Sequence, residues 1–467
     1  MSRIVALVSI GLISLLQVAR CLAQAPPQSL RLDQAVDLAI NNYPAIRVAR
    51  ERAAAAAGGV ELARTAYLPR TDLLWQENRA TTNNVFGLLL PQAVIPAISG
   101  PVLGTKSFDN VWGSAGGVLL SWEIFDLGLR RANVALARAE TSRADAGVEA
   151  TRFEAAIGAA DAFLTVIAVD QTVKSAQANV ERMETFSRSV HVLVDNQLRA
   201  GVDASRSDAE LAAARIQLIQ AQQNAELARA TLAELLGIAG AAVSIDAAGL
   251  LEFGPQPPEA SEKLESHPLA LEQISAVEVA RARERVIEKS YFPRFNFQTA
   301  FSGRGTGGLV SGKLDGTHGL LPETPNWASG LTITFSPLEI FSIRSRRKIE
   351  ASNEAAEKAR LDQTLQSLKA QEARARVLAD AARRIADTTP AQLAAAREAE
   401  FRTRARYDAQ LGTVSEVAEA QRLLAQAEID DSIARLGIWR AFLAAARARG
   451  DIKPFLEQVV TASQRRK

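Results

Sequence analysis

The sequence has little of the chemistry that enzymes and metal proteins depend on. Among 467 residues there are one cysteine and three histidines, and the histidines (His191, His267 and His318) are far apart along the chain. This set cannot supply a disulfide framework, a cysteine nucleophile or a tetrahedral zinc site. No glycine-rich run has the lysine and the serine or threonine of a phosphate-binding loop. The sequence therefore predicts no catalytic, cofactor-binding or metal site.

The chain also has no large excess of positive or negative charge. The chain has 54 lysines and arginines against 52 aspartates and glutamates, and these are not gathered into long blocks of one sign. A protein that binds nucleic acid normally presents a clustered basic surface. The sequence therefore predicts no nucleic-acid partner, and a hydrophobic content of 48% indicates a folded chain.

Long hydrophobic runs are absent except at the N-terminus. Arg3 precedes an apolar stretch and Ala23-Gln24-Ala25 offers a cleavage site, so residues 1–25 are predicted to be a secretory signal peptide. A membrane anchor is one alternative, although the run is shorter than a spanning helix needs. Lipidation of Cys21 is another, although Arg20 stands where a small residue is expected. Any membrane part of the mature chain must be β-structure or surface contact.

The chain contains an internal duplication. Tyr43-Pro44 begins a helical pattern that ends before Pro69-Arg70, and His267-Pro268 begins one of the same length that ends before Pro293-Arg294. Two further matches follow in the same order, Glu123-Ile124-Phe125 with Glu339-Ile340-Phe341 and Gly201 with Gly412. The sequence predicts a first repeat over 26–240, a linker over 241–265, a second repeat over 266–452 and a C-terminal tail over 453–467.

Each repeat reads as helix, strand, long loop, strand, very long helix, tight turn and helix. Alanine, glutamate, arginine, glutamine and leucine dominate the helical parts, and all are strong helix formers. Leu129–Arg199 is predicted to be one helix, and Arg344–Leu411 a second with a kink or short break at Thr389-Pro390. Apolar residues at helical spacing among many alanines indicate long helices packed side by side.

Four segments have the period-2 alternation of strands, namely Thr71–Gln76, Gly117–Ile124, Phe295–Ser302 and Leu331–Ser336. Alternation of apolar and polar residues is typical of transmembrane β-strands, and four strands of a soluble sheet are the alternative. On the membrane interpretation the residues predicted to face lipid are Leu73, Trp75, Val118, Leu120, Trp122, Phe295, Phe297, Phe301, Leu331, Ile333 and Phe335.

Four strands are too few to close a barrel, since single-chain barrels begin at eight. A membrane sheet cannot leave its edges unpaired in lipid. The chain is therefore expected to share its sheet with copies of itself, and three copies would supply twelve strands.

The chain resembles the TolC-like outer membrane efflux proteins (outer membrane factors) over nearly all of its mature length. The features that carry the resemblance are Leu32–Ala39 with Asn42-Tyr43-Pro44, Tyr67-Leu68-Pro69, Trp122–Gly128 leading into Arg130-Arg131, the turn at Gly201-Val202, Leu235-Leu236-Gly237 and the turn around Gly412. Each motif is weak alone, but together and in this order they are specific.

The resemblance implies a mainly α fold with a membrane β-barrel portion. Long coiled-coil-like helices would form a periplasmic α-barrel, and a homotrimer would share a 12-stranded β-barrel in the outer membrane. The implied function is passive conduction as the exit duct of a tripartite efflux or type I secretion system, without catalysis or cofactors. The implied partners are a periplasmic adaptor, an inner-membrane pump and outer membrane lipid. The alternative is a periplasmic coiled-coil adaptor or scaffold, which would not explain the alternating strands.

The resemblance also implies where the functional residues lie. The turns at Gly201-Val202 and Gly412-Thr413 would form the periplasmic tip, where the adaptor docks. Glu416 and Glu419 match the acidic residues that line the constriction of family members, and they are spaced to lie on one helix face. Three copies would form two acidic rings that favour cations. An ordinary solvated helix face is the alternative.

Overall fold

The structure is a computed structural model that describes residues 29–81, 108–247, 249–252, 254–255, 264–307 and 319–465. The predicted signal peptide and part of the predicted linker lie outside the described residues. The described residues form two compact units. The helical unit comprises those of Met1–Ala53, Ala144–Ile274 and Ala359–Lys467, and the sheet unit comprises those of Ala54–Arg143 and Ser275–Lys358.

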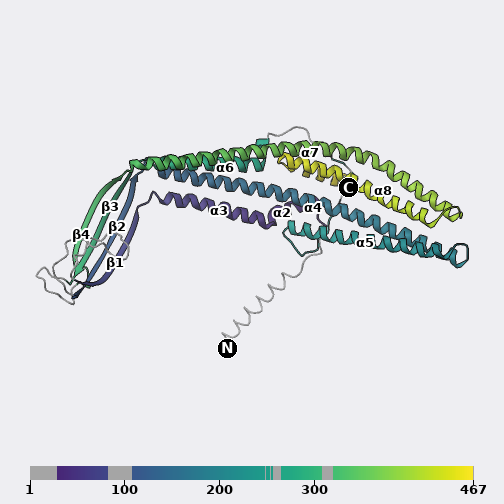
Figure 1. Cartoon of the computed structure of the whole chain (residues 1–467), viewed down its shortest axis with the longest axis horizontal. Helices are drawn as coiled ribbons and strands as arrows, with labels where there is room; N and C mark the ends of the chain where they lie inside the picture. The colour runs from purple at the N-terminus through teal and green to yellow at the C-terminus, as the bar shows by residue number, and fades with distance from the viewer. Residues whose placement is uncertain are drawn as a thin grey trace, which may run out of the picture. The chain divides into compact units, whose positions relative to one another are not determined.

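Most of the described chain is helical (Figure 1). The α-helices are α2 (Leu32–Asn42), α3 (Pro44–Thr65), α4 (Leu129–Asp195), α5 (Gly201–Leu235), α6 (Pro268–Lys289), α7 (Ile340–Asp408), α8 (Val414–Arg449) and α9 (Lys453–Gln464), with two short 3-10 helices, η1 (Leu264–Ser266) and η2 (Pro337–Glu339). With 67 residues in α4 and 69 in α7, each long helix extends about 100 Å at 1.5 Å per residue. The prediction of a mainly α chain with very long helices is confirmed. None of the described helices has the length and apolar content to span a membrane.

The second long helix differs from the prediction at Thr389-Pro390. The predicted short break is absent, since α7 continues through Pro390 as a single helix, whereas a kink within that helix stays a prediction. The residue before a proline normally avoids helical geometry. Here Thr389 is buried and its hydroxyl donates to Oδ1 of Asp431 on α8 at 3.1 Å, while Asp431 also pairs with Arg435. The bond from Thr389 to Asp431 joins α7 to α8 and holds Thr389 in the helix despite the proline.

The core of the helical unit gathers residues from both repeats. Phe163 of α4, Leu232 of α5 and Trp439 of α8 are buried together, and Leu32 of α2 joins them. Residues of the predicted C-terminal tail form α9, whose Phe455 lies edge-on to Trp439 with ring centroids 6.1 Å apart. Most of the other core positions are small or branched aliphatic residues, which lets the helix backbones approach closely.

In both repeats a glycine after the last long helix packs against the N-terminal part of the same repeat. Gly237 follows α5 with a φ of +71°, and a Cβ there would lie 2.6 Å from the carbonyl oxygen of Asn42. Gly450 follows α8 with a φ of +82°, and a Cβ there would lie 2.7 Å from the ring of His267. Only glycine combines the left-handed backbone with this close approach. The shared joint supports the predicted duplication.

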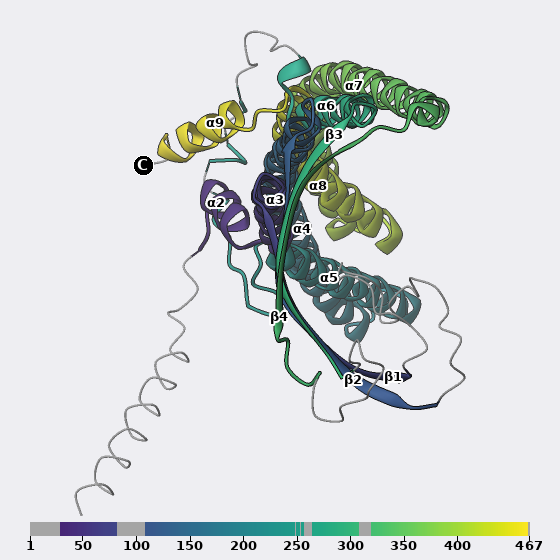
Figure 2. The ribbon, with the colours of Figure 1, turned by 90° about the vertical axis from the view of Figure 1, so that its left-hand side faces the viewer.

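The sheet unit contains one four-stranded antiparallel sheet in the order β1-β2-β3-β4, so that β1 and β4 are its edges. The strands are β1 (Arg70–Thr81), β2 (Asn110–Phe125), β3 (Arg294–Thr306) and β4 (Thr324–Thr334). Figure 2 shows them as one curved layer. All four are longer than the predicted segments, since the polar and glycine-containing ends also pair. A bulge lies between Glu123 and Phe125 where β2 meets β3.

The sequence match between Glu123–Phe125 and Glu339–Phe341 does not extend to secondary structure. Glu123–Phe125 ends strand β2, whereas Glu339 closes η2 and Ile340 begins α7. The change from strand to helix therefore comes earlier in the second copy of the motif, after Pro337, which favours the start of a helix.

Candidate functional site: an apolar sheet face and two helical tips

One face of the sheet is apolar from edge to edge. Residues that pair directly in antiparallel strands project to the same face. The register aligns Leu73 with Val118, Val118 with Phe301 and Phe301 with Trp327, which forms one apolar row across all four strands. Leu73 is 79% exposed, Phe301 64% and Trp327 73%. The row is therefore a surface and not part of a core.

The same face holds every strand residue for which we predict a lipid-facing position. Pairing places the others in rows on either side of the first, and they are Trp75, Leu120, Trp122, Phe295, Phe297, Leu331 and Ile333. Phe335 lies one residue beyond β4, where its ring is 5.6 Å from that of Tyr291. The band from Phe301 to Phe295 runs about 20 Å along β3 at roughly 3.3 Å per residue, close to the apolar height of membrane barrels.

Sequence reasoning missed Trp327, which lies on this face in β4. Pro325 and Gly330 interrupt the alternation on either side of it, so the pattern becomes clear only from Leu331 onward. On the same face Thr299 and Ser329 pair their hydroxyl groups at 2.7 Å. Each hydroxyl therefore has a partner that does not depend on water.

The opposite face of the sheet is mainly polar. Ser121 pairs with Gln298, whose Nε2 donates to the serine Oγ at 3.5 Å. In the next row Glu123 pairs with Asn296, and Asn296 pairs with Thr332. An apolar face opposite a polar face is the arrangement of a strand that separates lipid from water.

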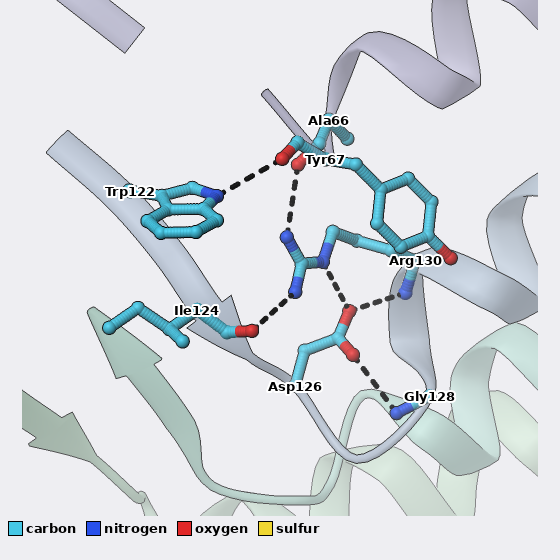
Figure 3. Close-up of polar contacts among 7 residues, drawn as sticks. All are labelled: Ala66, Tyr67, Trp122, Ile124, Asp126, Gly128 and Arg130. Atoms are coloured by element: carbon cyan, nitrogen blue, oxygen red, sulfur yellow. Dashed lines mark hydrogen bonds and ion pairs between the residues drawn. The ribbon is translucent and has the colours of Figure 1, made fainter. Parts of the chain in front are cut away.

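A buried ion pair holds the junction between β2 and α4 (Figure 3). Nε of Arg130 lies 3.0 Å from Oδ2 of Asp126, and each side chain is 9% exposed. The carboxylate also accepts the backbone N–H groups of Arg130 at 2.6 Å and Gly128 at 3.0 Å, which caps α4. Burial alone would raise the pKa of Asp126, but the hydrogen bonds and the positive charge of Arg130 outweigh it, so that the pKa lies below its ordinary value.

The same arginine connects this junction to the start of β1. Its guanidinium donates to the carbonyl oxygens of Ala66 at 3.3 Å and Ile124 at 3.2 Å and lies 4.8 Å from the centre of the Tyr67 ring. Trp122 adds a bond from its indole N–H to the Tyr67 carbonyl at 3.0 Å (Figure 3). Arg130 therefore joins the end of β2 to the turn that leads into β1.

The two hairpins of the helical unit end in the same turn. Gln197 follows α4 with a φ of +58° and Gln410 follows α7 with a φ of +63°. In each turn the amide of the next residue, Leu198 or Leu411, donates five residues back at 2.8 Å. This is the bonding of a Schellman cap, which usually has glycine at the left-handed position.

These turns place the residues that we predict for the tips. Gly201 is the first residue of α5 and Val202 the second, whereas Gly412 and Thr413 lie in the turn before α8. The structural match therefore pairs Gln197 with Gln410 and not Gly201 with Gly412. Sequence reasoning matched the glycines because it expected glycine at the turn itself.

Arg199 links the two tips within one chain, and sequence reasoning missed it. Its guanidinium donates to the carbonyl oxygens of Tyr407 and Gly412, both at 3.2 Å, and lies 4.6 Å from the centre of the Tyr407 ring. Tyr407 is 1% exposed and lies edge-on to Phe186 of α4. No local pattern marks this arginine, because its contacts are far away in sequence.

Glu416 and Glu419 lie on the exposed side of the first turns of α8. Glu416 forms a capping box with Thr413, since each side chain accepts the backbone N–H of the other residue. Glu419 pairs with Arg422. Both carboxylates are therefore at the tip and have local partners. In the described part of the chain, His, Cys, Asp and Glu side chains form no group of three or more that could hold a metal ion.

Comparisons with known proteins agree with this geometry. The family model described as outer membrane efflux protein matches residues 35–238. Protein CyaE of Bordetella pertussis is 29% identical over 255 residues, which cover 52% of this chain. The match spans about half of that relative, 47% of its length.

Solved structures extend the likeness to the whole fold. The CmeC outer membrane channel of Campylobacter jejuni is 16% identical with a TM-score of 0.74, and the alignment covers 93% of this chain and 89% of that one. The open state of the MtrE outer membrane channel of Neisseria gonorrhoeae is 18% identical with a TM-score of 0.70, covering 90% and 89%. The predicted resemblance to the TolC-like outer membrane efflux proteins is therefore confirmed, in sequence over residues 35–238 and in fold over about 90% of the chain.

Proposed function

We propose that this protein is an outer membrane exit duct that passively conducts substrates to the cell exterior. The observation that carries the proposal is the apolar sheet face, in which exposed rows such as Leu73-Val118-Phe301-Trp327 cross all four strands. Exposure of such a face to water costs a free energy of about 25 cal/mol for each Å² of apolar surface. Contact with the hydrocarbon of a bilayer removes this cost for the apolar face, and the polar face then lines a water-filled interior.

The open edges of the sheet explain why the working form contains several copies. Within the described residues, strands β1 and β4 each have one side without a partner strand. In lipid these N–H and C=O groups must be bonded, so β4 of one copy pairs with β1 of the next. The two edge strands run antiparallel, as the pairing of neighbours requires. We propose a homotrimer with a shared 12-stranded barrel, as in the family that the chain resembles.

The helical tips are the proposed site of gating and of contact with a periplasmic adaptor and an inner-membrane pump. We propose that Glu416 and Glu419 from three copies line the constriction and that the turns at Gly201-Val202 and Gly412-Thr413 meet the adaptor. The exposed carboxylates of the first turns of α8 support this role. Their ion pair and capping bond reduce the negative charge available to the pore, so we expect a modest cation preference.

The test is single-channel conductance in a planar bilayer, with protein purified from outer membranes. We expect discrete conductance steps and, in a salt gradient, a reversal potential on the cation side. The variant Glu416→Gln/Glu419→Gln removes both charges but keeps the capping box, because glutamine also accepts the N-cap N–H. It should shift the reversal potential toward zero while the step size changes by less than about twofold.

A matched control is Glu149→Gln/Glu226→Gln. These two glutamates also pair with arginines three residues later, on α4 and α5, but belong to neither tip. The control variant should have the same reversal potential and the same conductance step size as the unmodified protein. A reversal potential that is the same in all three proteins would remove the acidic rings from the proposal. A water-soluble helical protein that never inserts would overturn the duct itself in favour of a periplasmic scaffold.

A further inference from the structure

The start of α7 presents an apolar and basic surface, here called the α7 rim and formed by Leu338, Phe341, Arg344, Arg346 and Lys348. Leu338 is 80% exposed and Phe341 66%. The three cations are exposed as well, and within the described residues their side chains form no ion pair or hydrogen bond. We propose that the α7 rim binds the headgroups of anionic phospholipids. The proposal rests on the proposed membrane location of the sheet.

The order of residues along the chain matches a passage from hydrocarbon to headgroup. Ile333 lies on the apolar sheet face near the end of β4, and Leu338 and Phe341 follow it. Arg344 and Lys348 come three and seven residues after Phe341, on the same helix face. At 1.5 Å per residue they lie about 4.5 and 10.5 Å further along the axis, within reach of a headgroup layer several ångströms deep.

The position of these cations on the helix also calls for an anion. The first turn of a helix carries partial positive charge from unpaired N–H groups, which favours a nearby anion. Arg344 comes directly after the first turn of α7 and adds its own positive charge beside it. The first turn of α7 contains no acidic residue. Among the neighbouring acids, Glu284 of α6 is bonded to Arg347, and Glu350 accepts an N–H of Asn353. Glu339 precedes the helix and has no side-chain bond to the three cations.

In the first repeat, an internal carboxylate balances the positive charge at the start of the corresponding helix, α4. There the start of α4 also has two arginines, but the carboxylate of Asp126 accepts backbone N–H groups and pairs with Arg130. The duplication matches Asp126 to Ser342, whose hydroxyl instead donates to the carbonyl oxygen of Glu339 at 3.0 Å. The second repeat therefore keeps Arg346, which matches Arg130, but lacks the carboxylate that pairs with that arginine in the first repeat. A lipid phosphate at the α7 rim would take the place of the missing carboxylate.

The test compares lipid binding by the full mature protein in detergent, measured by native mass spectrometry. Phosphatidylglycerol and phosphatidylcholine are titrated separately, and we expect clear preference for the anionic lipid. The variant Arg344→Gln/Arg346→Gln/Lys348→Gln should weaken phosphatidylglycerol binding by about tenfold or more, given the usual contribution of each cation near an anionic surface. Phosphatidylcholine binding should stay the same.

The control variant is Lys369→Gln/Arg374→Gln/Arg383→Gln, which removes three exposed cations further along α7. It should bind both lipids as the unmodified protein does. The proposal is overturned if the unmodified protein shows no preference or if the rim variant keeps it. Inorganic phosphate at matched concentration should not displace the lipid, and displacement would identify a free-phosphate site instead.

A second variant separates lipid from another copy of the chain as the occupant. Leu338→Ser/Phe341→Ser should lower lipid binding and leave the oligomer mass unchanged by light scattering. A fall in mass with unchanged lipid preference would make the α7 rim a contact between copies and overturn the proposal. Conductance of the same samples reports on the duct separately, so loss of lipid preference with normal channels would count against the rim alone.

Discussion

Arg199 and Tyr407, which come from the two different repeats, are bonded through the backbone carbonyl of the tyrosine and stacked at 4.6 Å. The arginine follows the turn after α4, and the tyrosine belongs to the last turn of α7. One side chain therefore joins the two hairpin tips, through two hydrogen bonds to backbone carbonyls and one cation–π contact.

Replacing Arg199 with alanine should loosen the tips. Two carbonyl oxygens lose a charged donor, which costs about 1.5–3 kcal/mol for each bond of this kind. We expect amide hydrogen exchange in the turn at Gln410–Thr413 to accelerate by at least about tenfold in Arg199→Ala, since 1.4 kcal/mol is a factor of ten. Arg206→Ala, an exposed arginine on α5, is the control and should exchange as before. Equal exchange in both variants would contradict the role of Arg199.

Glycine at the two left-handed turn positions should stabilise the protein. Gln197 and Gln410 both have positive φ values, which cost a residue with a Cβ more than they cost glycine. Gln197→Gly and Gln410→Gly should each raise the free energy of unfolding by roughly 0.5–1 kcal/mol, seen as a higher thermal midpoint in detergent. Gln217→Gly, in the middle of α5, should lower it by about 1 kcal/mol. A destabilised turn variant would show that the glutamine side chains have contacts of their own.

Breaking the buried pair of Asp126 and Arg130 should destabilise the sheet unit. Arg130→Met leaves a buried carboxylate without its cation and two carbonyl groups without a donor, so the loss should be about 3 kcal/mol or more. Urea unfolding followed by the fluorescence of Trp122, which is bonded beside the pair, measures it. Arg131→Met, the exposed neighbour, should lose less than about 0.5 kcal/mol. Similar losses in both variants would argue against a special role of the pair.

The lowered pKa of Asp126 implies that the junction between β2 and α4 loses stability at low pH. Its pKa is lowered in the folded state, so its contribution to stability is fully present above the unfolded pKa of about 4 and is lost as the pH falls through the folded pKa. Stability between pH 5 and pH 8 should therefore not depend on this carboxyl. Asp126→Asn should flatten the loss of stability below pH 4, measured as the thermal midpoint against pH. An unchanged acid slope would show that other carboxyl groups dominate it.

The lowered pKa of His267, which packs against Gly450, implies a second pH dependence of protein stability. Burial lowers its pKa, while its Nε2 lies 3.0 Å from the Arg447 carbonyl and its Nδ1 accepts the N–H of Leu269. The folded state thus holds the neutral ring, and the unfolded state takes up a proton first. Stability is full above about pH 6.5 and falls as the pH drops through the folded pKa. His267→Asn, which can still cap α6, should remove this slope between pH 7.5 and 5.

Sequence patterns predicted the elements of the fold better than their ends and contacts. Period-2 alternation identified the apolar face of every strand, because the register of a sheet preserves that alternation across neighbours. Helix formers identified α4 and α7, and the absence of proline supported the continuity of α4. The continuity of α7 at Pro390 was missed because it depends on Asp431 of another helix.

The candidate site shows the same limit. Gly201 and Gly412 were matched as turn residues, whereas the turns have Gln197 and Gln410, since a Schellman cap is set by backbone bonds that tolerate a non-glycine residue at some cost. Arg130 was noted only as part of a motif. Its partners are Ala66, in the turn before β1, and Ile124, in β2, and no local sequence pattern indicates bonds to residues so far apart.

The two unpaired edges of the sheet have a consequence for how the protein is made. An isolated copy cannot enter a bilayer at low cost, so membrane insertion should follow a rate law of higher than first order in protein concentration. In the proposed ring each copy pairs its β4 edge with one neighbour and its β1 edge with the other. A copy with one disabled edge therefore blocks the closure of every ring it joins, and co-expression of such a copy with the intact protein should have a dominant negative effect.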